Sequence, residues 1–414
     1  MVDDWGTDRA QPVAVGSPRR ATSRAEKNRE ARRRRRRRMV RGFSLAALIV
    51  VVVGAIFVGS RLWHNMFGGV DDYAGGGVDD VVIQIHDGDS TTAIGQTLED
   101  HNVVATSEAF VAAAAGNSAI SSIQPGFYKV RTEISASNAV EQLADPQNRV
   151  GKLVIAEGRQ LDDVADVRTN AVTEGIFTLI SRASCVNLNG ERRCVDADEL
   201  REIARTAELS ALSVPDWAAE QVEAMGDDHR RLEGLIAPGT WNIDPSASAQ
   251  DILSRLIADS VKQYEEGGLL ETAKTLNMSP YEILTVASLV QREALPQDFA
   301  KVARVIYNRL VEYPKLEFDS TVNYPLDRIE VATTDADRAQ ATPWNTYVRE
   351  GLPATPIGSP GAEALAAAEH PAQGDWLYFV TIDMQGTTLF TRDFNEHLAN
   401  IQLAQNNGVL DSAR

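Results

Sequence analysis

Side chains that bind metals are scarce in this sequence. Its 414 residues include only two cysteines and six histidines, and the histidines are scattered along the chain. No histidine or further cysteine lies at the spacing of a zinc site. We therefore expect no metal and no other cofactor.

Basic side chains are scarce beyond the N-terminal tail. Residues 1–41 contain 14 Lys and Arg, with an unbroken run at Arg32–Arg38, against five Asp and Glu. The remaining 373 residues carry 27 basic and 53 acidic side chains, so the net charge of −17 combines two opposite parts. A strongly acidic body argues against nucleic-acid binding. Hydrophobic residues make up 43% and charged residues 24%, which excludes collagen, wholesale disorder and a polytopic membrane protein.

Long apolar runs are also rare, and the clearest one follows the basic tail. Gly42–Ser60 holds 19 uncharged residues, which span roughly 28 Å as a helix, close to the ~30 Å hydrocarbon core of a bilayer. A cleaved signal peptide is the alternative, but the preceding region is long and Ser60–Trp63 offers no cleavage site of small residues. We predict a retained transmembrane helix over 42–62.

The charges beside this span set the expected topology. Arginines before it place the tail 1–41 in the cytoplasm, where they attract anionic membrane lipid. The arginine run could instead bind nucleic acid or act as a localisation signal. We expect a single-pass plasma-membrane protein whose acidic body lies outside the membrane.

The two cysteines, Cys185 and Cys194, both fall in the exported part. An oxidising compartment favours a local disulfide between them, and a pair of free thiols is the alternative. We expect the bridge, with a structural role.

The exported part begins with a linker and a small module. Glycines and aspartates at 63–80 predict a flexible linker. Residues 81–150 predict a β-α-α-β unit with a closing helix. Its opening, Ile83–Leu98, resembles that of a LysM-like domain.

A larger domain follows the module. A strand and a glycine turn recur at Lys152–Gly158, and a helical pattern follows at 161–167. Longer helical patterns alternate with ordered-looking loops and short strands farther along the chain. We therefore predict a mixed α+β domain over 151–402 and a C-terminal tail over 403–414.

One helix in this domain carries an unusual carboxylate. Ser279 is a good N-cap, and Glu282 completes a capping box three residues later. Glu293 lies on the same stripe as Val286 and Val290, which face the core. A carboxylate on an apolar face must be neutral, paired or catalytic.

Two readings of Glu293 follow from the residues alone. Desolvation raises the pKa of a carboxyl group, which suits a general acid working near neutral pH. Alternatively, Glu293 is a buried residue paired with a base such as Arg304 or Arg309.

An ordered set of motifs extends from this helix to the end of the domain. The motifs are Ala-Ser-Leu-Val-x-x-Glu293, Val305–Leu310, Asp319-x-Thr-Val-x-Tyr324, Pro343–Tyr347, Gly351–Gly361 and Tyr378–Val380. Together with the anchor and the module, this order resembles the family of endolytic murein transglycosylases, the YceG-like or MltG-type enzymes. The resemblance places the family's catalytic acid at Glu293.

The resemblance also implies a substrate site and partners. Polar and aromatic side chains in the motifs are expected to bind peptidoglycan, with Asp319, Asn345 and Tyr347 positioning the glycan. The full expected set is Glu233, Asn308, Asp319, Thr321, Tyr324, Asn345, Tyr347 and Glu396. Expected partners are nascent peptidoglycan strands and the penicillin-binding proteins that synthesise them.

The implied reaction is lytic rather than hydrolytic. Protonated Glu293 would release a GlcNAc end, and the MurNAc C6 hydroxyl would close a 1,6-anhydro ring. Two alternatives remain at this stage. A hydrolase would use Asp319 as a second carboxylate, and a non-catalytic LysM-type scaffold would only bind the wall.

Overall fold

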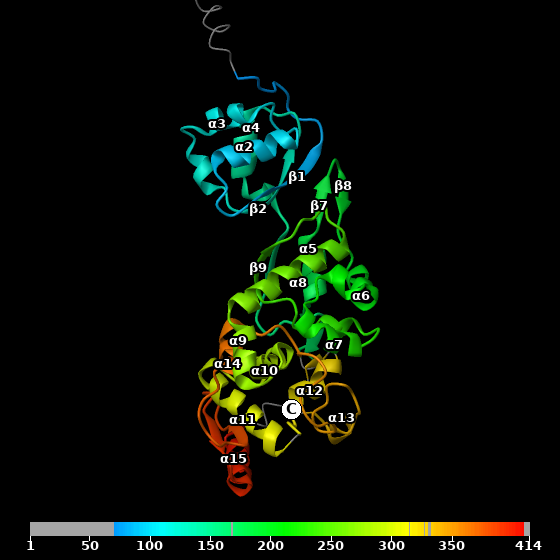
Figure 1. Ribbon diagram of the computed structural model, residues 1–414, viewed down its shortest axis with the longest axis vertical. Helices are drawn as coiled ribbons and strands as arrows, with labels where there is room; N and C mark the ends of the chain where they lie inside the picture. The colour runs from blue at the N-terminus through cyan, green and yellow to red at the C-terminus, as the bar shows by residue number, and fades with distance from the viewer. Residues whose placement is uncertain (1–69, 167–168, 314, 327, 330–332, 410–414) are drawn as a thin grey trace, which may run out of the picture. The chain divides into compact units, whose positions relative to one another are not determined.

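A computed structural model describes residues 70–166, 169–313, 315–326, 328–329 and 333–409 (Figure 1). The tail predicted over 1–41 and the transmembrane helix predicted over 42–62 lie outside the described residues. Among the residues that are described, no helix is both long and apolar enough to cross a membrane. The described residues from Asp71 onward belong to one compact unit.

The small module is a three-stranded antiparallel sheet covered by helices (Figure 1). Its elements appear in the predicted order, with a third strand added. They are β1 (Asp80–Ile85), α2 (Thr91–Asp100), α3 (Ser107–Ala114), β2 (Gly126–Arg131), α4 (Ala136–Ala144) and β3 (Arg149–Val150). Each helix starts at a hydroxyl N-cap, at Ser90, Thr106 and Ser135. A core of its own holds the module together, built around residues such as Leu98 and Phe110.

The described end of the predicted linker belongs to this module. Tyr73 donates its hydroxyl hydrogen to Asn102 Oδ1 (2.6 Å), and the backbone N–H of Ala136 donates to the Asp72 carboxylate (3.0 Å). Gly76 also pairs with Ile134 as an isolated bridge. The prediction of a flexible linker over all of 63–80 is therefore too long.

The larger domain is mainly helical, with short paired strands between the helices. Its strands are β4 (Lys152–Ile155), β5 (Val164–Asp166), β6 (Val172–Thr173), β7 (Val186–Leu188), β8 (Glu191–Arg193), β9 (Gly239–Asn242), β10 (Arg328–Ile329), β11 (Tyr378–Thr381) and β12 (Thr388–Thr391). Its helices are α5 (Ile176–Ala183), α6 (Ala197–Thr206), α7 (Asp216–Ala224), α8 (Ala249–Glu266), α9 (Leu269–Leu276), α10 (Pro280–Glu293), α11 (Phe299–Glu312), α12 (Asp319–Asn323), α13 (Asp335–Arg338), α14 (Ala362–Glu369) and α15 (Phe394–Asn406). The mixed α+β class is therefore correct, and α15 crosses the boundary predicted at residue 402.

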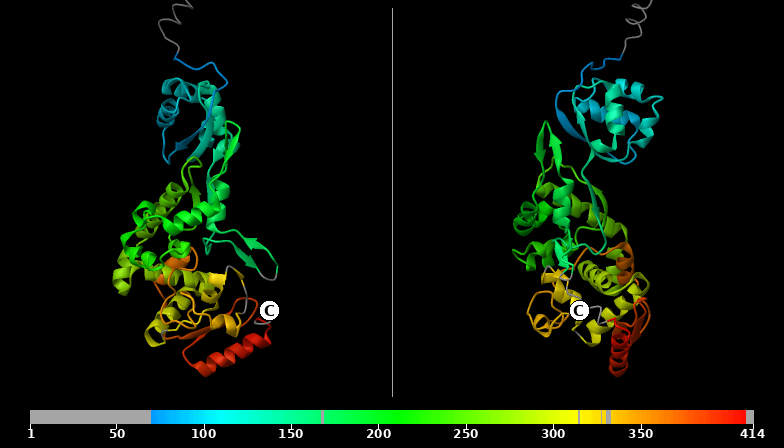
Figure 2. Two further views of the ribbon diagram at one scale, coloured as in Figure 1. Left: turned by 90° about the vertical axis from the view of Figure 1, so that its right-hand side faces the viewer. Right: turned by 180° about the vertical axis from the view of Figure 1, so that it is seen from behind.

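Strand pairing corrects one local prediction. The helix expected over 161–167 is absent, because Val164–Asp166 is strand β5. This strand pairs with β6 in an antiparallel sense and with β10, far along the chain, in a parallel sense. Figure 2 shows the β5–β6 hairpin projecting from the rest of the domain. The strand β4 pairs antiparallel with β9, and β7 pairs with β8.

A disulfide bond between Cys185 and Cys194 closes the β7–β8 hairpin, with the two Cα atoms 4.1 Å apart. The described residues contain no free cysteine. The bond therefore links the end of α5 to the segment that leads into α6.

Helix α10 is the centre of the larger core. Its predicted capping box is present: Ser279 Oγ accepts from the backbone N–H of Glu282 (3.1 Å), and Glu282 accepts from the N–H of Ser279 (2.7 Å). Every residue from Ile283 to Val290 is buried, mainly against α11 and α14 (Figure 1). The backbone leaves the helix at Ala294, so Glu293 is the last helical residue.

Candidate active site

Glu293 stands where the buried helix α10 meets the surface, and it is half-buried. Burial raises the pKa of its carboxyl group, and the nearby carboxylate of Asp319 raises it further. Ser320 and Arg292 oppose this rise. A carboxyl group in such surroundings holds its proton at higher pH than an ordinary glutamate, as a proton donor must.

Ser320 faces Glu293 from the first turn of α12. Its hydroxyl and its backbone N–H both favour the ionised form of Glu293. The buried Ser320 Oγ nevertheless has no partner of ordinary hydrogen-bond geometry. Ser320 therefore acts on Glu293 as a nearby dipole.

The alternative of a structural ion pair at Glu293 is wrong. Arg304 Nε donates to the carbonyl oxygen of Ala372 (2.5 Å), and Arg309 pairs with Glu317 (2.8 Å). Neither of these arginines is bound to Glu293. The carboxyl group has no salt bridge to any described residue.

Asp319 is held firmly beside Glu293 by three side chains. Tyr347 and Thr333 each donate a hydroxyl hydrogen to Asp319 Oδ1 (2.7 Å each). Arg338 Nη2 lies 3.1 Å from Oδ2, and its guanidinium carbon lies 5.1 Å from the centre of the Tyr347 ring. Both carboxylate oxygens of Asp319 are therefore engaged within the protein.

Asn345 shapes this arrangement from below the surface. It is 1% exposed, and its Nδ2 donates to the carbonyl oxygens of Arg338 (3.0 Å) and Gln340 (2.7 Å). Its Oδ1 accepts from the N–H of Tyr347 (2.9 Å). The expected contact between Asn345 and sugar is therefore replaced by a role in fixing the loop that carries Tyr347.

Thr321, Tyr324 and Glu233 are likewise buried, and the side chain of each forms at least one hydrogen bond to protein. Thr321 Oγ1 donates to the carbonyl oxygen of Phe318 (2.6 Å). Tyr324 donates to Glu233 Oε2 (2.7 Å), which also accepts from the N–H of Leu161 (3.1 Å). These three residues brace the segment around α12 and do not line a surface, so the expectation that they contact sugar is corrected.

Glu233 is 1% exposed, and its Oε1 has no hydrogen-bond partner. Burial raises the pKa of Glu233 to about 7, against the hydrogen bonds from Tyr324 and Leu161 and the positive charge of Arg230, which lower it. The negative charge of Asp162 raises it further.

Asn308 and Glu396 hold the C-terminal hairpin. Asn308 Nδ2 donates to the carbonyl oxygens of Trp376 (2.9 Å) and Gly374 (3.2 Å). Glu396 Oε2 accepts from the hydroxyl of Thr391 (2.5 Å). Asn308 Nδ2 and Glu396 Oε2, which were expected to bind substrate, thus form hydrogen bonds to the segments around β11 and β12. Of the predicted set, Asp319 lies beside Glu293, and Tyr347 binds Asp319.

No group of His, Cys, Asp and Glu side chains in the described part of the chain could hold a metal ion. Glu293 itself is a desolvated carboxyl group beside the negative charge of Asp319.

A family model described as the YceG-like family matches residues 83–403. The chain belongs to the YceG-like family. The match includes Glu293 and nearly all of the described residues.

Two relatives of this YceG-like chain carry the name endolytic murein transglycosylase. One, from Bacillus subtilis (strain 168), is 28% identical over 320 residues, covering 77% of this chain and 82% of the relative. The other, from Streptococcus pneumoniae serotype 2 (strain D39), is 27% identical over 336 residues, covering 78% of this chain and 58% of the relative. A solved structure of a yceG-like protein from Listeria monocytogenes is 23% identical, with a TM-score of 0.46, and the match covers 77% of this chain and 98% of that one.

The YceG-like site includes the glycine turn predicted at Lys152–Gly158, which the sequence did not connect with Glu293. The turn after β4 contains Gly158, whose N–H donates to the carbonyl oxygen of Ser359 (2.7 Å). Ser359 returns a bond from its N–H to the carbonyl oxygen of Arg159 (2.8 Å). Gln291, two residues before Glu293, accepts from the N–H of Gly361 (2.9 Å). The sequence signal for this contact was the motif Gly351–Gly361, because this loop holds the turn against α10.

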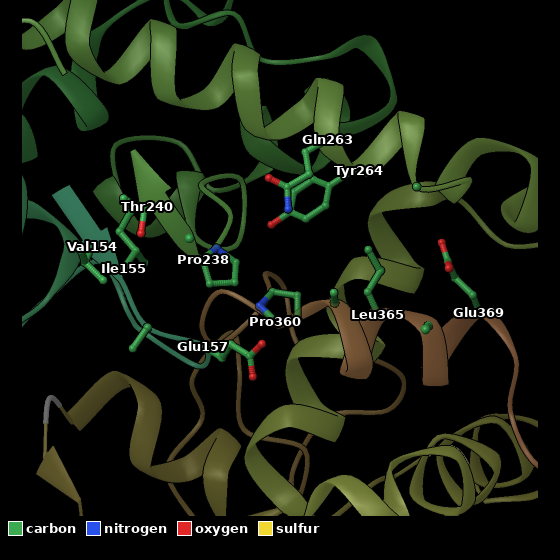
Figure 3. A pocket seen from close by; sticks show the side chains of 15 residues that line it. Val154, Ile155, Glu157, Pro238, Thr240, Gln263, Tyr264, Pro360, Leu365 and Glu369 are labelled. Atoms are coloured by element: carbon green, nitrogen blue, oxygen red, sulfur yellow. The ribbon is translucent and has the colours of Figure 1, made fainter. Parts of the chain in front are cut away.

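Glu157 lines two hollows beside this turn. The larger, of about 550 Å³, lies between β4, β9, the end of α8 and α14 (Figure 3). The smaller, of about 200 Å³, is lined by the turn and by Arg292, the neighbour of Glu293. Glu157 lines both hollows, and Glu293 lines neither.

Proposed function

We propose that this YceG-like chain is a membrane-anchored endolytic peptidoglycan lytic transglycosylase with Glu293 as its catalytic acid and base. The observation that carries the proposal is a desolvated, unpaired carboxyl group at the end of α10, with its pKa raised by burial and by Asp319. The name endolytic murein transglycosylase of its relatives supports the substrate class.

The reaction needs one proton donor that later accepts a proton. Protonated Glu293 donates to the oxygen of the MurNAc–GlcNAc bond as that bond breaks, which leaves a GlcNAc hydroxyl and positive charge at the MurNAc C1. The C6 hydroxyl of the same MurNAc attacks C1 and gives its proton to Glu293. The product is a 1,6-anhydroMurNAc end, and no water is consumed. An intramolecular nucleophile has a high effective concentration, so no second carboxylate is required.

The state of Asp319 argues against a two-carboxylate hydrolase. A hydrolase needs a free carboxylate as nucleophile or base. The oxygens of Asp319 are occupied by Tyr347, Thr333 and Arg338. We assign Asp319 to electrostatic control of Glu293.

Product analysis tests this function. Purified full-length protein in detergent is incubated with uncrosslinked glycan strands, and the new ends are identified by mass spectrometry. We expect anhydro ends from the wild type, and a loss of about 10²–10⁴-fold in rate for Glu293→Gln with an unchanged circular dichroism spectrum. Reducing ends instead of anhydro ends, or wild-type cleavage by Glu293→Gln, would refute the proposal.

The membrane anchor and topology are part of the same proposal. The sequence of 42–62, the preceding arginines and the Cys185–Cys194 disulfide together support a catalytic domain outside the plasma membrane. Labelling of single cysteines placed in residues 1–41 and in an exposed loop of the larger domain checks this orientation. Accessibility of the N-terminal tail from outside intact cells would contradict it.

The module and the partners extend the proposal. The order β1-α2-α3-β2 supports a LysM-like module that binds glycan strands. A transglycosylase anchored near the membrane would encounter glycan strands as penicillin-binding proteins synthesise them. Crosslinking in cells that grow new wall, compared with cells whose synthases are inhibited, tests the partnership.

A further inference from the structure

Arg292 is an arginine without a partner beside the proposed catalytic acid. It directly precedes Glu293 in the last turn of α10. No described residue forms a hydrogen bond or an ion pair with its guanidinium group. The side chain is accessible to solvent, yet surrounding protein atoms lower its pKa by burial, against the negative charges of Glu293 and Glu233. A solvent-exposed guanidinium group without a counter-ion is free to bind a ligand that carries a negative charge.

The surroundings of Arg292 form a small built hollow. Its volume is about 200 Å³, and Gly158, Arg159 and Gln160 line it together with Arg292. A side chain added at Gly158 would place its Cβ 4.0 Å from Arg292 Cδ, and the positive φ of Gly158 (+70°) lets the turn approach the arginine. Gln160 Nε2 donates to the carbonyl oxygen of Ile357 (3.2 Å), which fixes the wall of the hollow.

The charges that line the hollow leave Arg292 as the group available to a ligand. Asp162 is engaged by Arg201 (2.8 Å) and by His229 (2.5 Å). Arg159 donates through Nη1 to the carbonyl oxygen of Glu174 (2.9 Å).

Glu157 is the other unpaired charge at this hollow. Figure 3 shows its carboxylate beside Pro360, and Glu157 lines the larger hollow as well as the smaller one. The smaller hollow therefore presents the guanidinium group of Arg292 next to the reacting centre, with the carboxylate of Glu157 also in its lining.

We infer that Arg292 and this hollow form a subsite that binds a carboxylate of the substrate's lactyl–peptide arm, so that Arg292 is a specificity-determining residue. The inference rests on the proposed function, because it concerns how the same site holds its strand. A planar guanidinium binds a carboxylate through two parallel hydrogen bonds, which fixes the orientation of the ligand as well as its charge. The arm projects from the MurNAc ring whose C1 is attacked, so its anchoring would align the scissile bond with Glu293.

The test compares Arg292→Met with the wild type on matched strands. The substrates are uncrosslinked peptide-bearing strands, the same strands with their carboxylates chemically amidated, and strands stripped of peptide, in which the lactyl carboxylate is free. Arg292→Met should raise KM by about tenfold on strands with the recognised carboxylate and should have the same KM as the wild type on amidated strands. A rise confined to peptide-bearing strands identifies a peptide carboxylate, and a rise confined to stripped strands identifies the lactyl carboxylate.

Two further variants separate this role from indirect effects. Arg292→Lys keeps the charge beside Glu293 but loses the planar fork, so its KM should rise less than that of Arg292→Met. Arg205→Met removes an exposed charge on α6 and controls for net charge. An unchanged KM for Arg292→Met on both peptide-bearing and stripped strands, or an equal rise on native and amidated strands, overturns the inference. Absence of anhydro ends from the wild type would instead refute the proposed function itself.

Discussion

Replacing Glu233 with glutamine should change how the stability of this protein depends on pH. The wild-type carboxyl group is buried, and its pKa is about 7 instead of the ordinary value of 4.5. One pKa unit corresponds to about 1.4 kcal/mol, so this difference corresponds to about 3 kcal/mol of folding free energy. Glutamine has nearly the same shape and does not titrate.

The direction of the pH dependence follows from which state, folded or unfolded, binds the Glu233 proton more tightly. The folded state binds the Glu233 proton more tightly than the unfolded state, so its contribution to stability is complete below about pH 4.5. That contribution is lost as the pH rises through about 7. Relative to the wild type, Glu233→Gln should therefore gain about 3 kcal/mol in free energy of unfolding between pH 4.5 and pH 8.

Urea unfolding at several pH values measures this difference. Tryptophan fluorescence is a suitable probe, because Trp344 packs edge-on against Tyr324, the partner of Glu233, with ring centres 5.2 Å apart. A difference in free energy of unfolding that is the same at every pH does not report on the Glu233 proton, because the glutamine amide has hydrogen bonds of its own to satisfy. The exposed Glu223 on α7 provides the matched control, and Glu223→Gln should show no such trend. A difference between Glu233→Gln and the wild type that does not vary with pH would refute the reasoning.

Three other changes have defined outcomes. Asp319→Asn removes a negative charge that raises the pKa of Glu293, so the alkaline limb of the rate profile should move to lower pH, and an unmoved limb would contradict the electrostatic role. Replacing both cysteines of the β7–β8 hairpin by serine should lower the free energy of unfolding by about 2–4 kcal/mol in urea titrations, while a reducing agent should no longer affect the variant. Gly234→Ala should lower the free energy of unfolding by about 1–2 kcal/mol or more in the same assay. The reason is that φ is +81° and the new Cβ would lie 2.5 Å from Pro356 Cβ. An unchanged free energy of unfolding would show that the loop can move.

Local signals in the sequence were sufficient to predict the helix that carries Glu293. Ser279 and Glu282 mark its start through contacts within one turn, and the apolar stripe orients Glu293. The strand β5 was missed because it depends on pairing with β10, about 160 residues away, and not on its own periodicity.

The predicted substrate contacts were less reliable for a similar reason. Polar residue types indicate that Asn345 and Thr321 make hydrogen bonds, but they do not indicate with which atoms. In the fold, backbone carbonyls and a neighbouring hydroxyl satisfy them. Arg292, by contrast, was not among the residues predicted to contact substrate, because only the fold reveals that a charged side chain has no partner.

The hydrogen bonds between the Gly158 turn and the Gly351–Gly361 loop join segments that are far apart in the chain. They therefore limit how early during synthesis the enzyme can become active. Gln160 reaches the backbone of Ile357 across 197 positions, and Gln291 binds the N–H of Gly361. A ribosome must therefore release nearly the whole domain before the carboxyl group at Glu293 acquires its surroundings. An incompletely translated or truncated chain would carry Glu293 without its desolvated surroundings, so the proposed catalytic acid would form only in the complete domain.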